Sequence, residues 1–143
     1  MFCGLQGSGK STFFARTFAD SHVRLNLDML RTRHREDILL HACLAAQQPF
    51  VADNTNASAA QRARYAALAR AAGFATVECY WFDVPVERCL VRNAGRPDDA
   101  RVPDVAIRGT AAKLEPPTRG EGFDRVRRVT FDDAGAAMIE ELP

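Results

Sequence analysis

The sequence predicts an α/β fold, a three-layer sandwich in which helices cover both faces of a central parallel β-sheet. Two observations carry this prediction. Short, continuously apolar runs alternate with segments of helical periodicity, which is typical of βαβ units whose strands are buried on both faces. A glycine-rich segment, residues 4–9, separates the first apolar run from the first helical segment. With 143 residues, 47% of them hydrophobic, the chain suits a single domain (1–143) with its own core.

The individual elements follow from apolar periodicity and from the residues that begin and end helices. The expected strands are residues 1–3, which is short for a strand, 23–27, 50–52, 74–82 and 126–131. The expected helices are residues 12–20, 28–44 with a polar interruption at 31–37 left open, 58–72, 86–93, 103–114 and 132–142. Ser58 and Gln61 have the spacing of a capping box, and Gly73 is expected just beyond the end of that helix.

Residues 4–12, GLQGSGKST, match the Walker A phosphate-loop pattern G-x-x-x-x-G-K-[S/T] completely. Glycines let the backbone N–H groups turn inward around an anion, and the helix that follows points the positive end of its dipole at the same place. We expect Lys10 to contact the β- and γ-phosphates of ATP and Ser11 to ligate Mg²⁺. Further ATP contacts are expected from Gly7, Ser8, Gly9 and Thr12. An accidental glycine–serine turn is disfavoured because Lys10 is one of only two lysines in the chain. The pattern therefore predicts a P-loop NTPase fold of the kinase type.

Two acidic residues follow apolar runs at the edge of the sheet where open parallel sheets bind their ligands. Asp28 is placed to act as general base for an attacking hydroxyl, and Arg31, one turn along, could hold a phosphate of the acceptor. A helix N-cap is the alternative role for Asp28. Asp53 is expected either to hold Mg²⁺, directly or through water, or to support the acceptor site beside Arg31. A simple turn residue is the alternative for Asp53.

Residues 95–103, GRPDDARVP, predict a short mobile lid. An arginine on a closing loop can stabilise the charge of a transferring phosphoryl group while the loop excludes water. Arg96, between Gly95 and Pro97, is the preferred lid arginine, and Arg92 is expected to contact the nucleotide. Arg101 is equally well explained as a solvated loop residue.

Taken together, these motifs resemble the kinase domain of polynucleotide 5′-hydroxyl kinases, the end-healing enzymes of phages and animals. The resemblance extends from Gly4 to about Val129 through the segments GLQGSGKST, NLDMLR, ADNTN, RNAGR and VP. Residues 53–73 and 112–123 are especially similar to the animal form. Two features depart from the family pattern: the lid is lean and the first strand is short. No phosphatase, ligase or fork-head-associated module lies within the 143 residues.

The resemblance implies a role for each matching residue. Lys10 and Ser11 would bind ATP and Mg²⁺, and Asp28 would be the base for the 5′-hydroxyl. On the acceptor side, Arg31 would bind a phosphate with the support of Asp53. Arg96 would be the arginine of the lid.

The residues alone are compatible with three functions. A nucleic-acid 5′-hydroxyl kinase is preferred, with a groove that Arg24, Arg31, Arg33 and Arg35 could line. A kinase for a small-molecule alcohol, such as a sugar, an antibiotic or a nucleoside, would use the same base and lid around a smaller pocket. A non-enzymatic nucleotide switch is disfavoured, because there is no Asn-Lys-x-Asp motif and the only Asp-x-x-Gly segment, 132–135, comes too late in the chain.

Composition limits the partners. A formal net charge of +1 gives no whole-molecule attraction to nucleic acid or to an anionic membrane, so any polyanion site must be local. The four cysteines lack zinc-ligand spacing and are expected to be buried thiols in a reducing compartment. No signal peptide or spanning apolar run is present. The expectation is a cytoplasmic protein without a membrane or an obligatory protein partner.

Overall fold

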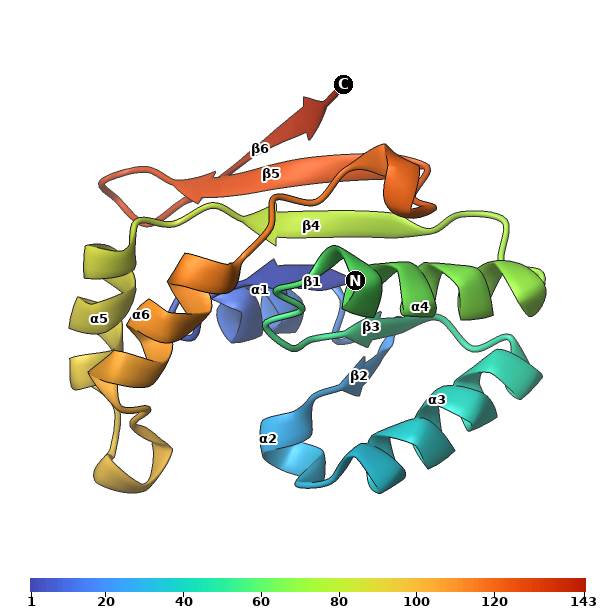
Figure 1. Ribbon diagram of the computed structural model, residues 1–143, viewed down its shortest axis with the longest axis horizontal. Coiled ribbons are helices and arrows are strands. Elements are labelled where there is room, and N and C mark those ends of the chain that lie inside the picture. Colours follow the sequence, from blue (N-terminus) through green and yellow to red (C-terminus); the bar gives the residue numbers. More distant parts are fainter.

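The computed structural model describes residues 1–143 and has the α/β architecture that the sequence predicts (Figure 1). The strands are β1 (Phe2–Gly4), β2 (Val23–Leu25), β3 (Phe50–Ala52), β4 (Glu78–Phe82), β5 (Arg125–Phe131) and β6 (Ala137–Leu142). The α-helices are α1 (Lys10–Thr17), α2 (Leu27–Leu30), α3 (Arg33–Ala46), α4 (Ala59–Ala71), α5 (Val86–Ala94) and α6 (Asp104–Lys113), with 3₁₀ turns η1 (Asp98–Ala100) and η2 (Arg119–Glu121). None of the helices is long and apolar enough to cross a membrane.

The sheet is parallel except at one edge. β1 pairs with β4 and β4 with β5 in parallel, while β6 is antiparallel to β5. β2 and β3 form a second parallel pair, which a bridge between Phe2 and Asp53 joins to β1. The strands β1, β4 and β5 point towards the end of the molecule where α5 and α6 lie side by side (Figure 1). Loops that follow the parallel strands therefore meet at one edge.

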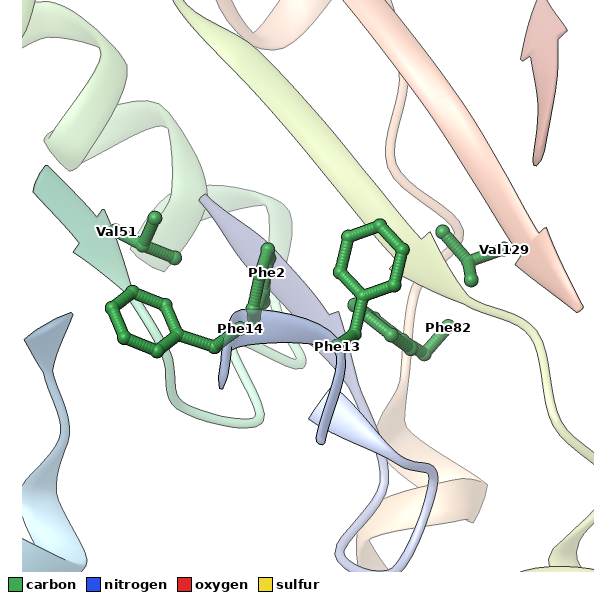
Figure 2. Close-up of a cluster of buried hydrophobic side chains, with 6 residues drawn as sticks. All are labelled: Phe2, Phe13, Phe14, Val51, Phe82 and Val129. Atoms are coloured by element: carbon green, nitrogen blue, oxygen red, sulfur yellow. The ribbon is translucent and has the colours of Figure 1, made fainter. Parts of the chain in front are cut away.

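Side-chain alternation along β1 places helices on both faces of the sheet. Phe2 packs on one face against Phe13 and Phe14 of α1, in the aromatic cluster that Figure 2 shows with Val51, Phe82 and Val129. Cys3, the next residue, packs on the other face against Ala66 of α4. Because successive strand residues point to opposite faces, α1 and α4 cover opposite faces of the sheet. All four cysteines are free and buried, as the sequence predicts.

The C-terminal segment corrects one expectation, since residues 137–142 form strand β6 and not a helix. Gly135, with a φ of 81°, turns the chain back, and the Asp132 carboxylate accepts a hydrogen bond from the backbone N–H of Ala136 at 2.8 Å. The strand then completes the edge of β5 in register from Phe131 to Val126. Pairing of this otherwise open edge outweighs the local helix propensity of the segment.

The helix expected over 28–44 is in fact two helices. α2 ends at Leu30, and the next residue, Arg31, has a backbone φ of 73°. Thr32 then caps α3 by accepting a hydrogen bond from the backbone N–H of Arg35. The interruption is thus two residues long. The capping box of Ser58 with Gln61 at the start of α4 is confirmed.

Candidate functional site

A cavity of about 400 Å³ lies at the edge of the sheet where the parallel strands end. Its lining comes from the phosphate loop, residues 26–33 with the start of α2 and the first residue of α3, the segment after β3, and α5 with the lid. The lining residues are Gln6, Gly7, Ser8, Gly9, Lys10, Ser11, Thr12, Asn26, Leu27, Asp28, Arg33, Asp53, Asn54, Thr55, Arg92 and Arg96. Four segments far apart in the sequence therefore share one cavity.

Two glycines of the phosphate loop are required by its backbone. Gly7 has a φ of 77°, and a Cβ atom there would lie 2.5 Å from the carbonyl oxygen of Cys89. Gly9 has a φ of 98° at the N-cap of α1, and a Cβ atom there would lie 2.9 Å from the ring of Phe131. A side chain at either position would be strained and would clash with its neighbour. The loop can therefore hold its curved conformation only with glycine at these positions.

Lys10 begins α1 and turns its ammonium group into the loop. Its Nζ donates hydrogen bonds to the carbonyl oxygens of Gly4 at 2.8 Å and Leu5 at 2.7 Å. Burial lowers the pKa of Lys10 to about 8, although the negative charge of Asp53 works in the opposite direction. A bound phosphate would restore the charged form by supplying an anion next to the ammonium group.

Ser11 and Asp53 lie on either side of one arginine. Asp53 is 1% exposed, and its Oδ2 accepts a hydrogen bond from Nε of Arg24 at 2.7 Å. Nη2 of the same guanidinium donates to Oγ of Ser11 at 2.7 Å. Oδ1 of Asp53 is buried without any hydrogen-bond partner. A hydroxyl and a free carboxylate oxygen are ligands that Mg²⁺ accepts, so these two residues fit a magnesium site.

The partner of Asp53 differs from the one that sequence reasoning considered. Arg24, and not Arg31, makes the ion pair with its carboxylate. Arg24 lies in β2 and is aimed at the end of the neighbouring strand β3. A charged residue in the middle of a short, partly buried strand was the only signal for this contact in the sequence.

Asp28 lies in the first turn of α2 and lines the cavity. The N-cap role that was the alternative for Asp28 belongs to Asn26, whose Oδ1 accepts from the backbone N–H of Met29 at 3.1 Å. Nδ2 of Asn26 donates to the carbonyl oxygen of Asp53 at 2.7 Å, and Oδ1 of Asn54 accepts from the backbone N–H of Leu27 at 2.9 Å. Both contacts tie the start of α2 to the segment after β3, so the position of the Asp28 backbone is well defined.

Arg31 is exposed and does not line the cavity, whereas Arg33 does. Arg33 is held by Glu36, a fully buried residue whose Oε2 accepts from Nη1 of Arg33 at 2.8 Å. Oε1 of Glu36 accepts from Nδ2 of Asn54 at 2.9 Å. The sequence predicted no role for Asn54, although it belongs to the ADNTN segment, and none for Glu36. The break at Arg31 and Thr32 turns the chain so that Arg33, two residues later, faces the cavity.

The lid, residues 95–103, follows α5, and one buried side chain at the end of that helix joins the two ends of the lid. Asn93 is fully buried, and its Nδ2 donates to the carbonyl oxygen of Val102 at 2.6 Å while its Oδ1 accepts from the Val102 N–H at 3.0 Å. Arg92 lies over the ring of Phe131, 5.0 Å from its centre, and Arg96 lines the cavity. Arg101 lies outside the cavity lining and donates to the carbonyl oxygen of Arg96.

Comparison with protein families agrees with this geometry. A family model described as an AAA domain, AAA_33, matches residues 1–117, which is most of the chain. The chain therefore belongs to this family of P-loop proteins, which includes kinases. It is a nucleotide-binding P-loop protein of the kinase-like kind, with the central, mostly parallel sheet of that class.

Proposed function

We propose that the protein is an ATP-dependent kinase that transfers the γ-phosphoryl group to a hydroxyl, with the 5′-hydroxyl of a nucleic acid as its preferred acceptor. The observation that carries the proposal is the shared cavity. The phosphate loop, the carboxylate of Asp28 and the guanidinium of Arg96 all line it. A donor phosphate, a base for the acceptor and a cation for the transferring group are what phosphoryl transfer requires.

In this proposal each residue has one task. Lys10 and the backbone N–H groups of the loop hold the β- and γ-phosphates, and Arg96 neutralises charge on the γ-phosphoryl oxygens. Asp28 accepts the proton of the acceptor hydroxyl. At the same time the hydroxyl oxygen bonds to the γ-phosphorus, and the bond from that phosphorus to the β-γ bridging oxygen breaks. Mg²⁺, held by Ser11 and, directly or through water, by Asp53, would supply positive charge to the phosphate oxygens.

A second cavity supports a nucleotide as the donor. It has a volume of about 330 Å³ and shares Gly9, Thr12 and Arg92 with the first. Phe131, at the end of β5, also lines it. An aromatic ring and a guanidinium plane are suitable surfaces for a nucleobase. We therefore assign the base of ATP to this second cavity and its phosphates to the first.

The polarity of the main cavity supports an anionic acceptor. Leu27 is the only hydrophobic residue among the sixteen that line it, while Arg33, Arg92 and Arg96 bring positive charge. Pockets for small organic molecules are mostly apolar, whereas nucleic-acid backbones are bound by arginine and polar groups. This lining favours a nucleic-acid end over an apolar alcohol.

The experiment measures transfer of labelled γ-phosphate from ATP and Mg²⁺ to short 5′-hydroxyl oligonucleotides of DNA and RNA, beside a panel of sugars and nucleosides. We expect labelled oligonucleotide, lost in Lys10→Ala, and a KM for the oligonucleotide that rises with salt because phosphate contacts weaken. Transfer to neutral alcohols alone would contradict the nucleic-acid acceptor. No transfer to any alcohol by a protein that binds ATP would contradict the proposed kinase activity.

A further inference from the structure

We propose that the guanidinium of Arg24 is a built-in cation that holds the divalent-metal position, and that the metal–nucleotide complex must displace it to bind. Arg24 thereby sets the metal affinity of the site. The inference rests on the proposed function, because it takes Ser11 and Asp53 as the magnesium residues. It concerns a residue that neither the phosphate-loop motif nor the family match assigns.

Arg24 contacts both residues that are expected to hold the metal. One guanidinium bridges Oδ2 of Asp53, with Nη2 at 2.6 Å and Nε at 2.7 Å, and Oγ of Ser11, with Nη2 at 2.7 Å. The carbon at the centre of the guanidinium also stands over the ring of Phe14, 5.5 Å from the ring centre. Only 27% of the Arg24 side chain is exposed, so the side chain is mostly buried and is held by these contacts.

Charge balance explains why a cation is needed here in the absence of nucleotide. The carboxylate of Asp53 is 1% exposed, and a buried ionised carboxylate is costly unless a positive partner is close. Arg24 is the only residue that makes an ion pair with Asp53. It holds Oδ2 of Asp53 next to Ser11, and the other carboxylate oxygen, Oδ1, stays without a partner.

The same contacts make Arg24 a competitor of the metal. Mg²⁺ binds its ligands at about 2.0–2.1 Å and demands a regular geometry. An ion on Oγ of Ser11 would meet Nη2 of Arg24 at that same oxygen, and the two positive charges would repel each other. The hydrogen bond from Nη2 of Arg24 to Oγ of Ser11 must therefore be given up when the metal–nucleotide complex binds.

The test titrates a fluorescent ATP analogue at a series of free Mg²⁺ concentrations, with wild-type protein, Arg24→Gln, Arg24→Lys and Arg108→Gln. Arg108 is an exposed residue of α6 that pairs with Glu87 outside the cavity lining, so its variant removes the same charge elsewhere. We expect the Mg²⁺ concentration at half-saturation to fall about tenfold in Arg24→Gln, the equivalent of one charge-assisted hydrogen bond. Arg24→Lys should lie between, and Arg108→Gln should match the wild type.

Thermal unfolding in EDTA provides a second readout that needs no nucleotide. Arg24→Gln should unfold several degrees lower than the wild type, because Asp53 loses its partner. If Arg24→Gln does not fold, the test is made with Arg24→Lys, which keeps a positive charge. If the wild type binds the analogue, but the Mg²⁺ concentration at half-saturation is unchanged or higher in either Arg24 variant, the inference alone is overturned. Failure of the wild type to bind the analogue at any Mg²⁺ concentration would overturn the proposed function, and the inference with it.

Discussion

The buried position of Lys10 makes its charged form less favourable than in water, and a nearby anion would offset this effect. Its ammonium group has only carbonyl oxygens and the Ser8 hydroxyl as hydrogen-bond partners. Burial lowers its pKa from 10.5 to about 8. Nucleotide phosphates next to Nζ would favour the charged form and raise that pKa again. Binding of nucleotide should therefore be linked to binding of a proton.

This linkage can be measured by isothermal titration calorimetry of ATP binding in buffers that differ in ionisation enthalpy. At about pH 8 the wild type should take up about half a proton per nucleotide, because roughly half of Lys10 is neutral there before binding. The uptake should shrink towards pH 7, where Lys10 is already protonated. Lys10→Met should show no such uptake in any binding that it retains. Equal uptake at both pH values would contradict a Lys10 pKa near 8.

The same burial affects stability in a defined direction. Between about pH 8 and 10.5 the unfolded chain holds a proton on Lys10 that the folded, nucleotide-free chain has released. The contribution of Lys10 to the free energy of unfolding therefore rises with pH across this window. The burial of Lys10 is therefore most destabilising below about pH 8, where its ammonium group is charged in the folded chain.

At the scale of elements, the lid depends on one clamp at the end of α5. Asn93 makes two hydrogen bonds to the backbone of Val102 and so joins the two ends of residues 95–103. A loop whose ends are closed by a buried side chain can move as a unit. Arg96, in this loop, lines the cavity, so its position depends on the clamp.

Asn93→Ala should loosen the lid. It removes both hydrogen bonds, and loss of such buried partners costs about 1–3 kcal/mol. Limited proteolysis with trypsin should then cut after Arg101 about tenfold faster than in the wild type. Val91→Ala, on the exposed side of the same helix, is the matched control and should behave as the wild type. Equal cleavage rates for Asn93→Ala and wild type would contradict the role of Asn93 as a clamp.

Element prediction from the sequence succeeded where local signals decide and failed where pairing at long range decides. The phosphate loop, the capping box of Ser58 and the glycine after α4 are local patterns, and the structure has all three. Residues 137–142 carry a helix-compatible pattern, yet they pair with the edge of β5. The edge of β5 exists only in the folded chain, so the local sequence pattern could not predict that residues 137–142 pair with it.

At the scale of the whole molecule, the parallel sheet gathers the site. Asp28 and Asp53 follow β2 and β3, and the phosphate loop follows β1. The rule that ligands lie beyond the carboxyl ends of parallel strands led to these residues from the sequence, and all of them line the cavity. The contacts of Arg24 with Asp53, and of Glu36 with Asn54, depend on how distant segments meet in space. No spacing in the sequence encodes them.

The central claim is that one cavity serves both the nucleotide and the acceptor, with Asp28 as the base between them. The most direct test is a paired measurement on Asp28→Asn, with ATP affinity and single-turnover transfer to a 5′-hydroxyl oligonucleotide taken from the same preparation. Affinity for ATP should stay within about twofold of the wild type, because Asp28 lies outside the phosphate loop. Transfer should be slower by about 10²–10⁴-fold, the usual contribution of a general base. Transfer at the wild-type rate by the variant would contradict the claim.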